Sequence, residues 1–134
     1  MPESSDPKVF LFEETEWVDE HAEGRASPEM IEAGERLGAR RKRMAQGEGG
    51  FYFQYTTMPP GFEVPLHSHD HDELFVVLSG GCRLWPDGPE RSIELGPRDS
   101  ATLAAGHAYR FFCGAEGMEF YVVRRGDASA TMMA

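Results

Sequence analysis

The stretch "GFEVPLHSHDHDELFVVLSG", residues 61–80, gathers metal-ligating side chains directly before an apolar segment. In an extended chain, side chains two residues apart point to the same face. One face of residues 67–79 therefore carries four ligand-type side chains, His67, His69, His71 and Glu73. The other face is apolar at positions 74, 76 and 78, and a strand that is apolar on both faces is normally covered on both. We predict a strand that lines a barrel and is covered by a sheet edge, the N-terminal segment or, most simply, the second subunit of a homodimer.

The spacing of these side chains suits a metal ion. Two imidazoles in a His-x-His strand lie roughly 6.5–7 Å apart along the chain, so both can reach one ion above the strand. Glu73 has the same parity and can bring a carboxylate to that ion. Two neutral nitrogens and one carboxylate oxygen suit a divalent transition metal (Fe, Mn, Ni, Co or Zn) and leave positions open for substrate. The structural alternative is a solvated turn in which histidines happen to cluster.

Composition narrows the class of protein. With 134 residues the chain can bury a core without disulfides, and its 15 glycines and 9 prolines favour short strands over a helical bundle. A net charge of -10 argues against nucleic acid or an anionic membrane as the main partner. We find no membrane-spanning run and no secretory signal, so we expect a cytoplasmic protein. In that compartment Cys82 and Cys113 are expected to be reduced and buried.

From Phe51 onward, β-prone segments alternate with turns. We predict strands at residues 51–57, 73–78, 82–85, 92–95, 100–104, 109–113 and 118–125, with turns at 79–81 and 86–88. About eight short strands in one small domain are typical of a β-sandwich or barrel.

The N-terminal third is charged and is predicted to be an extension, residues 1–48. It would contain a short strand at 9–12 and a short helix that begins at Ser27-Pro28 and runs towards Leu37, and it would pack on the barrel or on a partner subunit. The basic run "ARRKRM", residues 39–44, is interpreted as solvated or paired with the preceding acidic segment rather than as a nucleic-acid site. The barrel is predicted to cover residues 49–126, and residues 127–134 to be a disordered tail.

The residues around the histidine cluster resemble the first motif of the cupin superfamily at every defined position. The matching pattern is Gly61, five residues, His67-Ser68-His69, three residues, Glu73, six residues and Gly80. The resemblance covers about residues 51–124 and implies an all-β, small jelly-roll barrel with a metal in its mouth, held by His67, His69 and Glu73. His71 lies outside the motif, and its parity allows a contact with a ligand side chain or with substrate.

The second cupin motif usually ends in Pro-x-Gly-x-x-His, and the stretch "LGPRDSATLAAGHAYRFF", residues 95–112, departs from it. One alignment places Tyr109 where the histidine normally stands, whereas counting from Gly96 places His107 there. His107 could therefore supply a further metal nitrogen. Alternatively, Tyr109 would be a hydrogen-bond donor, an acid/base group or a polar wall residue. The sequence leaves both alternatives open.

The resemblance implies a metal-dependent protein that acts on a small organic molecule. Non-haem dioxygenase or Lewis-acid chemistry is the first expectation, with isomerase, cyclase or lyase reactions close behind. The alternative is a non-catalytic module that binds a metal or a small molecule. A third possibility is that the charged N-terminal segments dock a protein partner. No nucleic-acid or membrane partner is expected.

Overall fold

The computed structural model describes residues 7–18, 40–125 and 130–132. It contains the 3-10 turns η1 (Phe12–Glu14) and η2 (Glu48–Gly50), and eight strands: β1 (Arg40–Gln46), β2 (Phe51–Met58), β3 (Glu63–His69), β4 (Glu73–Trp85), β5 (Ile93–Leu95), β6 (Ser100–Leu103), β7 (Tyr109–Arg125) and β8 (Ala130–Met132). Within these ranges, no helix has the length and apolarity needed to cross a membrane.

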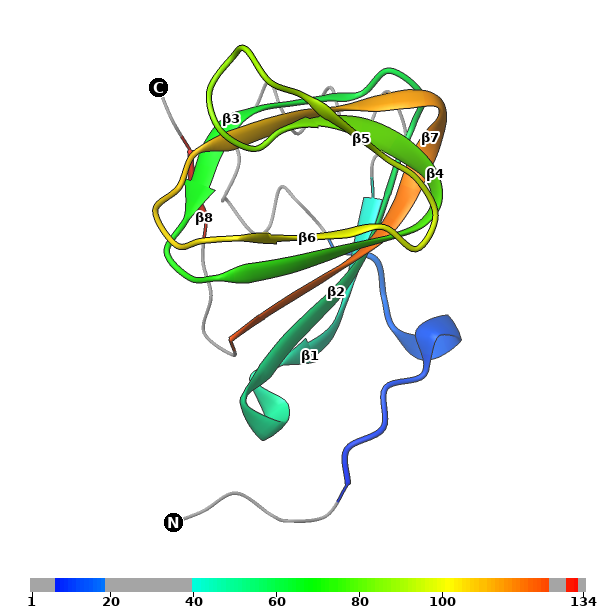
Figure 1. The fold of residues 1–134 in the computed structure, drawn as a ribbon. Coiled ribbons are helices and arrows are strands. Elements are labelled where there is room, and N and C mark those ends of the chain that lie inside the picture. Colours follow the sequence, from blue (N-terminus) through cyan, green and yellow to red (C-terminus); the bar gives the residue numbers. More distant parts are fainter. Residues whose placement is uncertain (1–6, 19–39, 126–129, 133–134) are drawn as a thin grey trace.

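Antiparallel pairing joins the strands into a barrel of the jelly-roll type. β7 pairs with β2, β3 and β4, while β4 also pairs with β5 and β6. Figure 1 shows β4 and β7 bending so that each contributes to both layers of the barrel. This confirms the predicted all-β barrel. The two long, bent strands are what bring distant parts of the sequence to one end of it.

Two segments predicted as separate strands are continuous in the structure. Residues 79–81 lie inside β4 rather than forming a turn, and residues 114–117 lie inside β7. Gly80 and Gly117 both have positive φ, +68° and +71°, where the two strands pair with shifted register. Glycine permits a β-bulge as readily as a turn, so the sequence pattern could not distinguish a bend within a strand from its end.

The barrel interior is filled by apolar side chains from β4, β6 and β7. The rings of Phe75 and Phe120 stack with their centroids 4.6 Å apart, and Phe111 contacts both. Cys82 and Cys113 lie opposite each other in the register, and both are free and buried, as expected. Burial raises the pKa of each thiol to about 12, so both remain protonated at neutral pH.

The odd-numbered face of β4 is buried as predicted, but its even-numbered face is not covered within the described residues. Phe75 and Val77 are 2% and 0% exposed, whereas Leu74 and Leu78 are 38% and 37% exposed. A second subunit would cover this outer face. The homodimer therefore stays a prediction.

The predicted strand at residues 9–12 is wrong, because this segment leads into η1 without pairing to a sheet. Lys42 Nζ donates a hydrogen bond of 2.7 Å to the carbonyl of Phe12. The same ammonium lies 3.9 Å from the ring centroid of Phe12 and 4.8 Å from that of Trp17. The Phe12 carbonyl therefore accepts from Lys42 and, within η1, from the Thr15 N–H. These cation–π contacts hold the N-terminal segment on the outer face of β1 and β2.

The basic run forms most of β1, an edge strand paired with β2. The sheet therefore begins at Arg40, before residue 49, where the barrel was predicted to begin. The charges of the run alternate between faces, with Lys42 under the N-terminal segment and Arg43 donating to the Tyr52 hydroxyl at 3.0 Å. These contacts join the run to a backbone carbonyl, aromatic rings and a tyrosine hydroxyl. Its pairing with the preceding acidic segment stays a prediction. The helix predicted from Ser27 towards Leu37 lies outside the described residues.

The C-terminal tail differs from the disordered segment predicted for residues 127–134. Residues 130–132 form β8, whose backbone pairs with the end of β3, from His67 opposite Met132 to His69 opposite Ala130. The edge of β3 offers free backbone groups, and a short segment can pair with such an edge whatever its side chains. Composition alone could not reveal this pairing.

Candidate functional site

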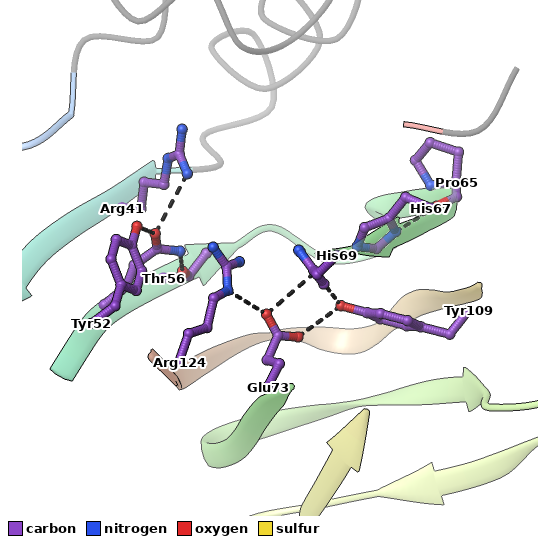
Figure 2. Close-up of polar contacts among 10 residues, drawn as sticks. Arg41, Tyr52, Thr56, Pro65, His67, His69, Glu73, Tyr109 and Arg124 are labelled. Carbon is purple, nitrogen blue, oxygen red and sulfur yellow. Dashed lines mark hydrogen bonds and ion pairs between the residues drawn. The ribbon is translucent and has the colours of Figure 1, made fainter. Parts of the chain in front are cut away.

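Three strands bring four of the predicted site residues together inside one end of the barrel (Figure 2). His67 and His69 end β3, Glu73 begins β4 and Tyr109 begins β7. All four are buried, with exposed fractions of 3–7%. The ring centroid of His67 lies 4.9 Å from that of His69 and 4.4 Å from that of Tyr109. The turn at residues 70–72 redirects the chain so that Glu73 faces the two histidines.

Tyr109 lies between the second histidine and the carboxylate. Its hydroxyl donates a hydrogen bond of 2.8 Å to Glu73 Oε2 and lies 2.9 Å from His69 Nε2. Tyr109 uses its single hydroxyl proton in the hydrogen bond to Glu73. The Nε2 of His69 therefore carries a proton and donates it to the tyrosine oxygen. Burial, reinforced by the charge of Glu73, raises the pKa of Tyr109 far above its ordinary value, which keeps the side chain a hydroxyl.

Arg124 completes the cluster and was not named from the sequence. Its Nε donates to Glu73 Oε1 at 2.9 Å, and the side chains are 8% and 2% exposed. Arg124 lies opposite Glu73 in the β4–β7 register and opposite Tyr52 in the β2–β7 register. The available signal was parity, because Arg124 shares its face of β7 with the buried Phe120 and Val122.

A row of polar side chains on β2 continues the site along the inner wall. The Tyr52 hydroxyl donates to Gln54 Oε1 at 2.5 Å, and Gln54 Nε2 donates to Thr56 Oγ1 at 2.8 Å. Two arginines of β1 join this row, Arg43 through Tyr52 at 3.0 Å and Arg41 through Gln54 at 3.4 Å. The sequence pattern indicated only an aromatic strand here. The available signal was the alternation of Tyr52, Gln54 and Thr56 on one face of that strand.

His107 is not brought to the cluster. Its side chain is 44% exposed, and Nε2 lies 2.6 Å from the carbonyl oxygen of Pro86. A carbonyl only accepts, so Nε2 carries the proton and donates it there. Tyr109, not His107, lies beside His67, His69 and Glu73, as in the alignment that placed the tyrosine at the histidine position. His71 is half-buried in the bend before β4.

His67 is held as a neutral imidazole. Its Nδ1 lies 3.0 Å from the Pro65 carbonyl, which can only accept, so Nδ1 carries the proton and Nε2 keeps a lone pair. Burial lowers the pKa of His67 below its ordinary value. This tautomer, fixed by a backbone carbonyl, is the one in which metal-ligating histidines are commonly held.

Stability of chelator-treated protein is expected to rise with pH between about 5 and 7. In that range the unfolded chain takes up a proton at His67 that the folded chain excludes, so falling pH favours unfolding. Urea titrations at several pH values measure the slope, and His67→Gln is expected to flatten it. His107→Gln, at an exposed histidine, is the control. An equal slope in wild type and His67→Gln would contradict the prediction.

A family model described as a cupin domain matches residues 54–124, just over half of the chain. The chain belongs to the cupin family. No curated protein sequence matches this cupin.

Solved structures share the fold of this cupin at low sequence identity. The polyketide cyclase RemF from Streptomyces resistomycificus is 22% identical with a TM-score of 0.61, over 72% of this chain and 71% of that one. KdgF from Halomonas sp. is 16% identical with a TM-score of 0.66, over 90% and 94%. The DMSP lyase DddQ from Ruegeria pomeroyi is 19% identical with a TM-score of 0.69, over 89% and 61%. At these identities the likeness shows the fold alone.

The donor chemistry of this cupin's site fits a divalent transition metal. His67 offers a lone pair at Nε2, and His69 and Glu73 supply a second imidazole and a carboxylate. Within the described ranges, no three histidine, cysteine or acidic side chains converge on one point as ligands would. Both oxygens of Glu73 receive protein donors, Oε1 from Arg124 and Oε2 from Tyr109. Coordination by Glu73 would require one of these contacts to be exchanged.

Proposed function

We propose that this cupin binds one divalent transition metal through His67, His69 and Glu73 and acts there on a small organic molecule. The observation that carries the proposal is the burial of two imidazoles and a carboxylate in contact distance of one another, inside one end of the barrel. Burial of polar groups costs stability, because the groups lose their hydration. A function for the buried groups accounts for a cluster that carries this cost. The cupin family membership supports the same assignment.

The metal, when bound, would act as a Lewis acid on an oxygen atom of the substrate. The chain's own residues supply the rest of the chemistry. Tyr109 holds a proton on a hydroxyl with a strongly raised pKa, directly beside His69 and Glu73. Such a group can donate a hydrogen bond or a proton to a developing negative charge on the substrate.

Lewis-acid chemistry of the isomerase, cyclase or lyase type is the reaction class that we favour, ahead of the dioxygenase type. The support is Tyr109, because a protonated hydroxyl at the position of a usual fourth ligand suits proton handling. The similar folds of a polyketide cyclase and of DMSP lyases are compatible with this class. A protein that binds a small molecule without turnover is the second candidate. The observation that favours it is the engagement of both Glu73 oxygens by protein donors.

Metal content per chain, measured by elemental analysis on protein purified without a tag or chelator, tests the proposal. We expect close to one equivalent in wild type and its loss in His67→Ala, since one of two imidazole ligands is removed. Tyr109→Phe is expected to retain the metal. His107→Ala is the matched control, because that histidine is exposed and bonded to Pro86.

Two results would overturn this assignment. One is the absence of bound metal in wild type after loading with Fe(II), Mn(II), Ni(II), Co(II) and Zn(II). The other is equal metal content in wild type and His67→Ala. If wild type binds metal, a loss of turnover in Tyr109→Phe with metal retained would favour the enzyme over the binding module.

A further inference from the structure

Arg124 lies beside Glu73, and two further arginines, Arg43 and Arg41, lie along the polar row of β2, in a chain whose net charge is -10. We propose that these arginines bind the carboxylate of a small organic acid, with Arg124 as the main contact and Arg43 and Arg41 beside it. This inference rests on the proposed function, because it names the class of substrate for the same site.

The strand register places the arginines on the face that carries the site. Tyr52 of β2, Arg124 of β7 and Glu73 of β4 are register partners in one row across three strands. Directly opposed residues of antiparallel strands point to the same face. In the neighbouring rows, Arg43 is opposite Gln54 and Arg41 is opposite Thr56. The row that begins at Glu73 reaches β1 at Gln46, and the arginines of β1 lie on the same face in the next two rows.

The contacts of Arg124 leave one side of its guanidinium for a ligand. Nε donates to Glu73 Oε1 at 2.9 Å, and the carbon of the guanidinium lies 5.1 Å from the ring centroid of Tyr52. Figure 2 shows the two Nη atoms on the side away from Glu73, between the polar row of β2 and His69. Two parallel N–H donors on a planar group match the two oxygens of a carboxylate. Glu73 thus fixes the orientation of the group that would bind the substrate.

The polar row of β2 fixes the other two guanidinium groups. Arg43 Nε is bonded to the Tyr52 hydroxyl at 3.0 Å, and Arg41 Nη1 to Gln54 Oε1 at 3.4 Å. Tyr52 and Gln54 are themselves buried and joined to each other. Oriented cations along a partly buried wall strengthen the attraction for an anion, because solvent screens the charges less there.

The rest of the barrel limits the size of the acid. Below the site, the interior is filled by the packed rings of Phe75, Phe111 and Phe120. The packed rings leave the polar end, with Arg124 and the cluster of His69, Glu73 and Tyr109, as the part of the barrel where the acid would bind. The proposal places the carboxylate of a compact acid on Arg124 and its reacting oxygen towards Tyr109.

Benzoate and benzamide are matched probes for this proposal, because they share a shape and differ in charge. Isothermal titration of chelator-treated protein is expected to show benzoate binding at least about tenfold more tightly. Arg124→Gln is expected to remove this preference. Arg125→Gln, an exposed arginine on the same strand, removes the same charge and is expected to retain it.

Arg124→Gln leaves Glu73 without its cation and could fail to fold, so Arg124→Lys and Arg43→Gln are included. Lysine can still pair with Glu73 but has no second parallel donor, and we expect the preference to fall at least about fivefold. Equal affinity of wild type for the two probes would overturn the inference, as would an unchanged preference in folded Arg124→Lys and Arg43→Gln. The titrations use protein made metal-free with a chelator. Carboxylate binding is therefore tested independently of metal binding, and the failure of one can be distinguished from the failure of the other.

Discussion

Glu73→Gln is expected to abolish metal binding and to lower the free energy of unfolding by about 3–5 kcal/mol. The carboxylate is 3% exposed and accepts hydrogen bonds from Arg124 and Tyr109. Glutamine keeps the size of the side chain but removes the charge, which leaves Arg124 as a buried cation without its counterion. Urea unfolding at pH 7 measures the loss of stability, and a titration with Zn(II) or Mn(II) measures the loss of the site.

Glu94→Gln is the matched control for this prediction. Glu94 also pairs with an arginine, Arg83, but these side chains are 72% and 45% exposed. Exposed pairs contribute about 0–1 kcal/mol, since solvent screens both charges. The double substitution Glu73→Gln with Arg124→Gln is expected to recover part of the lost stability, because it removes the stranded cation. Equal losses in Glu73→Gln and Glu94→Gln would show that the buried pair contributes no more than a surface one.

Spacing along the sequence was sufficient to find the residues that lie close together in the chain. His67, His69 and Glu73 fall within seven residues, but the single strand predicted for residues 67–79 is two strands in the structure. The chain bends at residues 70–72, and this bend, not shared parity along one strand, turns Glu73 towards the histidines. Tyr109 was found because the second motif departs from its usual pattern at that position. Parity could place Arg124 and the row on β2 on an inner face, but it could not place them beside Glu73. Register, and not spacing, brings these residues to Glu73, and the spacing of residues along the chain does not reveal which strands become neighbours.

The same limit explains which parts of the fold were predicted. Alternating and β-prone segments gave most of the strands of the barrel, because these patterns follow from burial of one face. The long strands β4 and β7 were each predicted as two, since a glycine-containing bend resembles a turn. β1 was hidden by its charges, which the sheet accommodates through cation–π contacts on one face and hydrogen bonds on the other. In each case a tertiary partner decided the local structure.

Gly80→Ala is expected to destabilise the barrel by about 4 kcal/mol, the sum of backbone strain and a steric clash. Gly80 has φ +68°, and a Cβ there would lie 2.1 Å from the carbonyl oxygen of Gly117. Backbone atoms of a paired strand cannot move aside as a flexible side chain can. Gly117→Ala is expected to behave alike, because its Cβ would lie 2.5 Å from the Met58 carbonyl oxygen. Urea or thermal unfolding of the purified variants measures both losses.

Gly88→Ala separates the two causes. Gly88 has φ +78°, but no atom lies within 4 Å of its added Cβ, so only the conformational cost of about 1 kcal/mol is expected. The difference between Gly80→Ala and Gly88→Ala then measures how firmly β4 and β7 are held where they bend. These strands also carry Glu73 and Arg124 at their other ends. Equal losses of stability in Gly80→Ala and Gly88→Ala would mean that β4 and β7 separate easily at the bend. The pairing at the bend would then not fix the position of the Glu73–Arg124 pair.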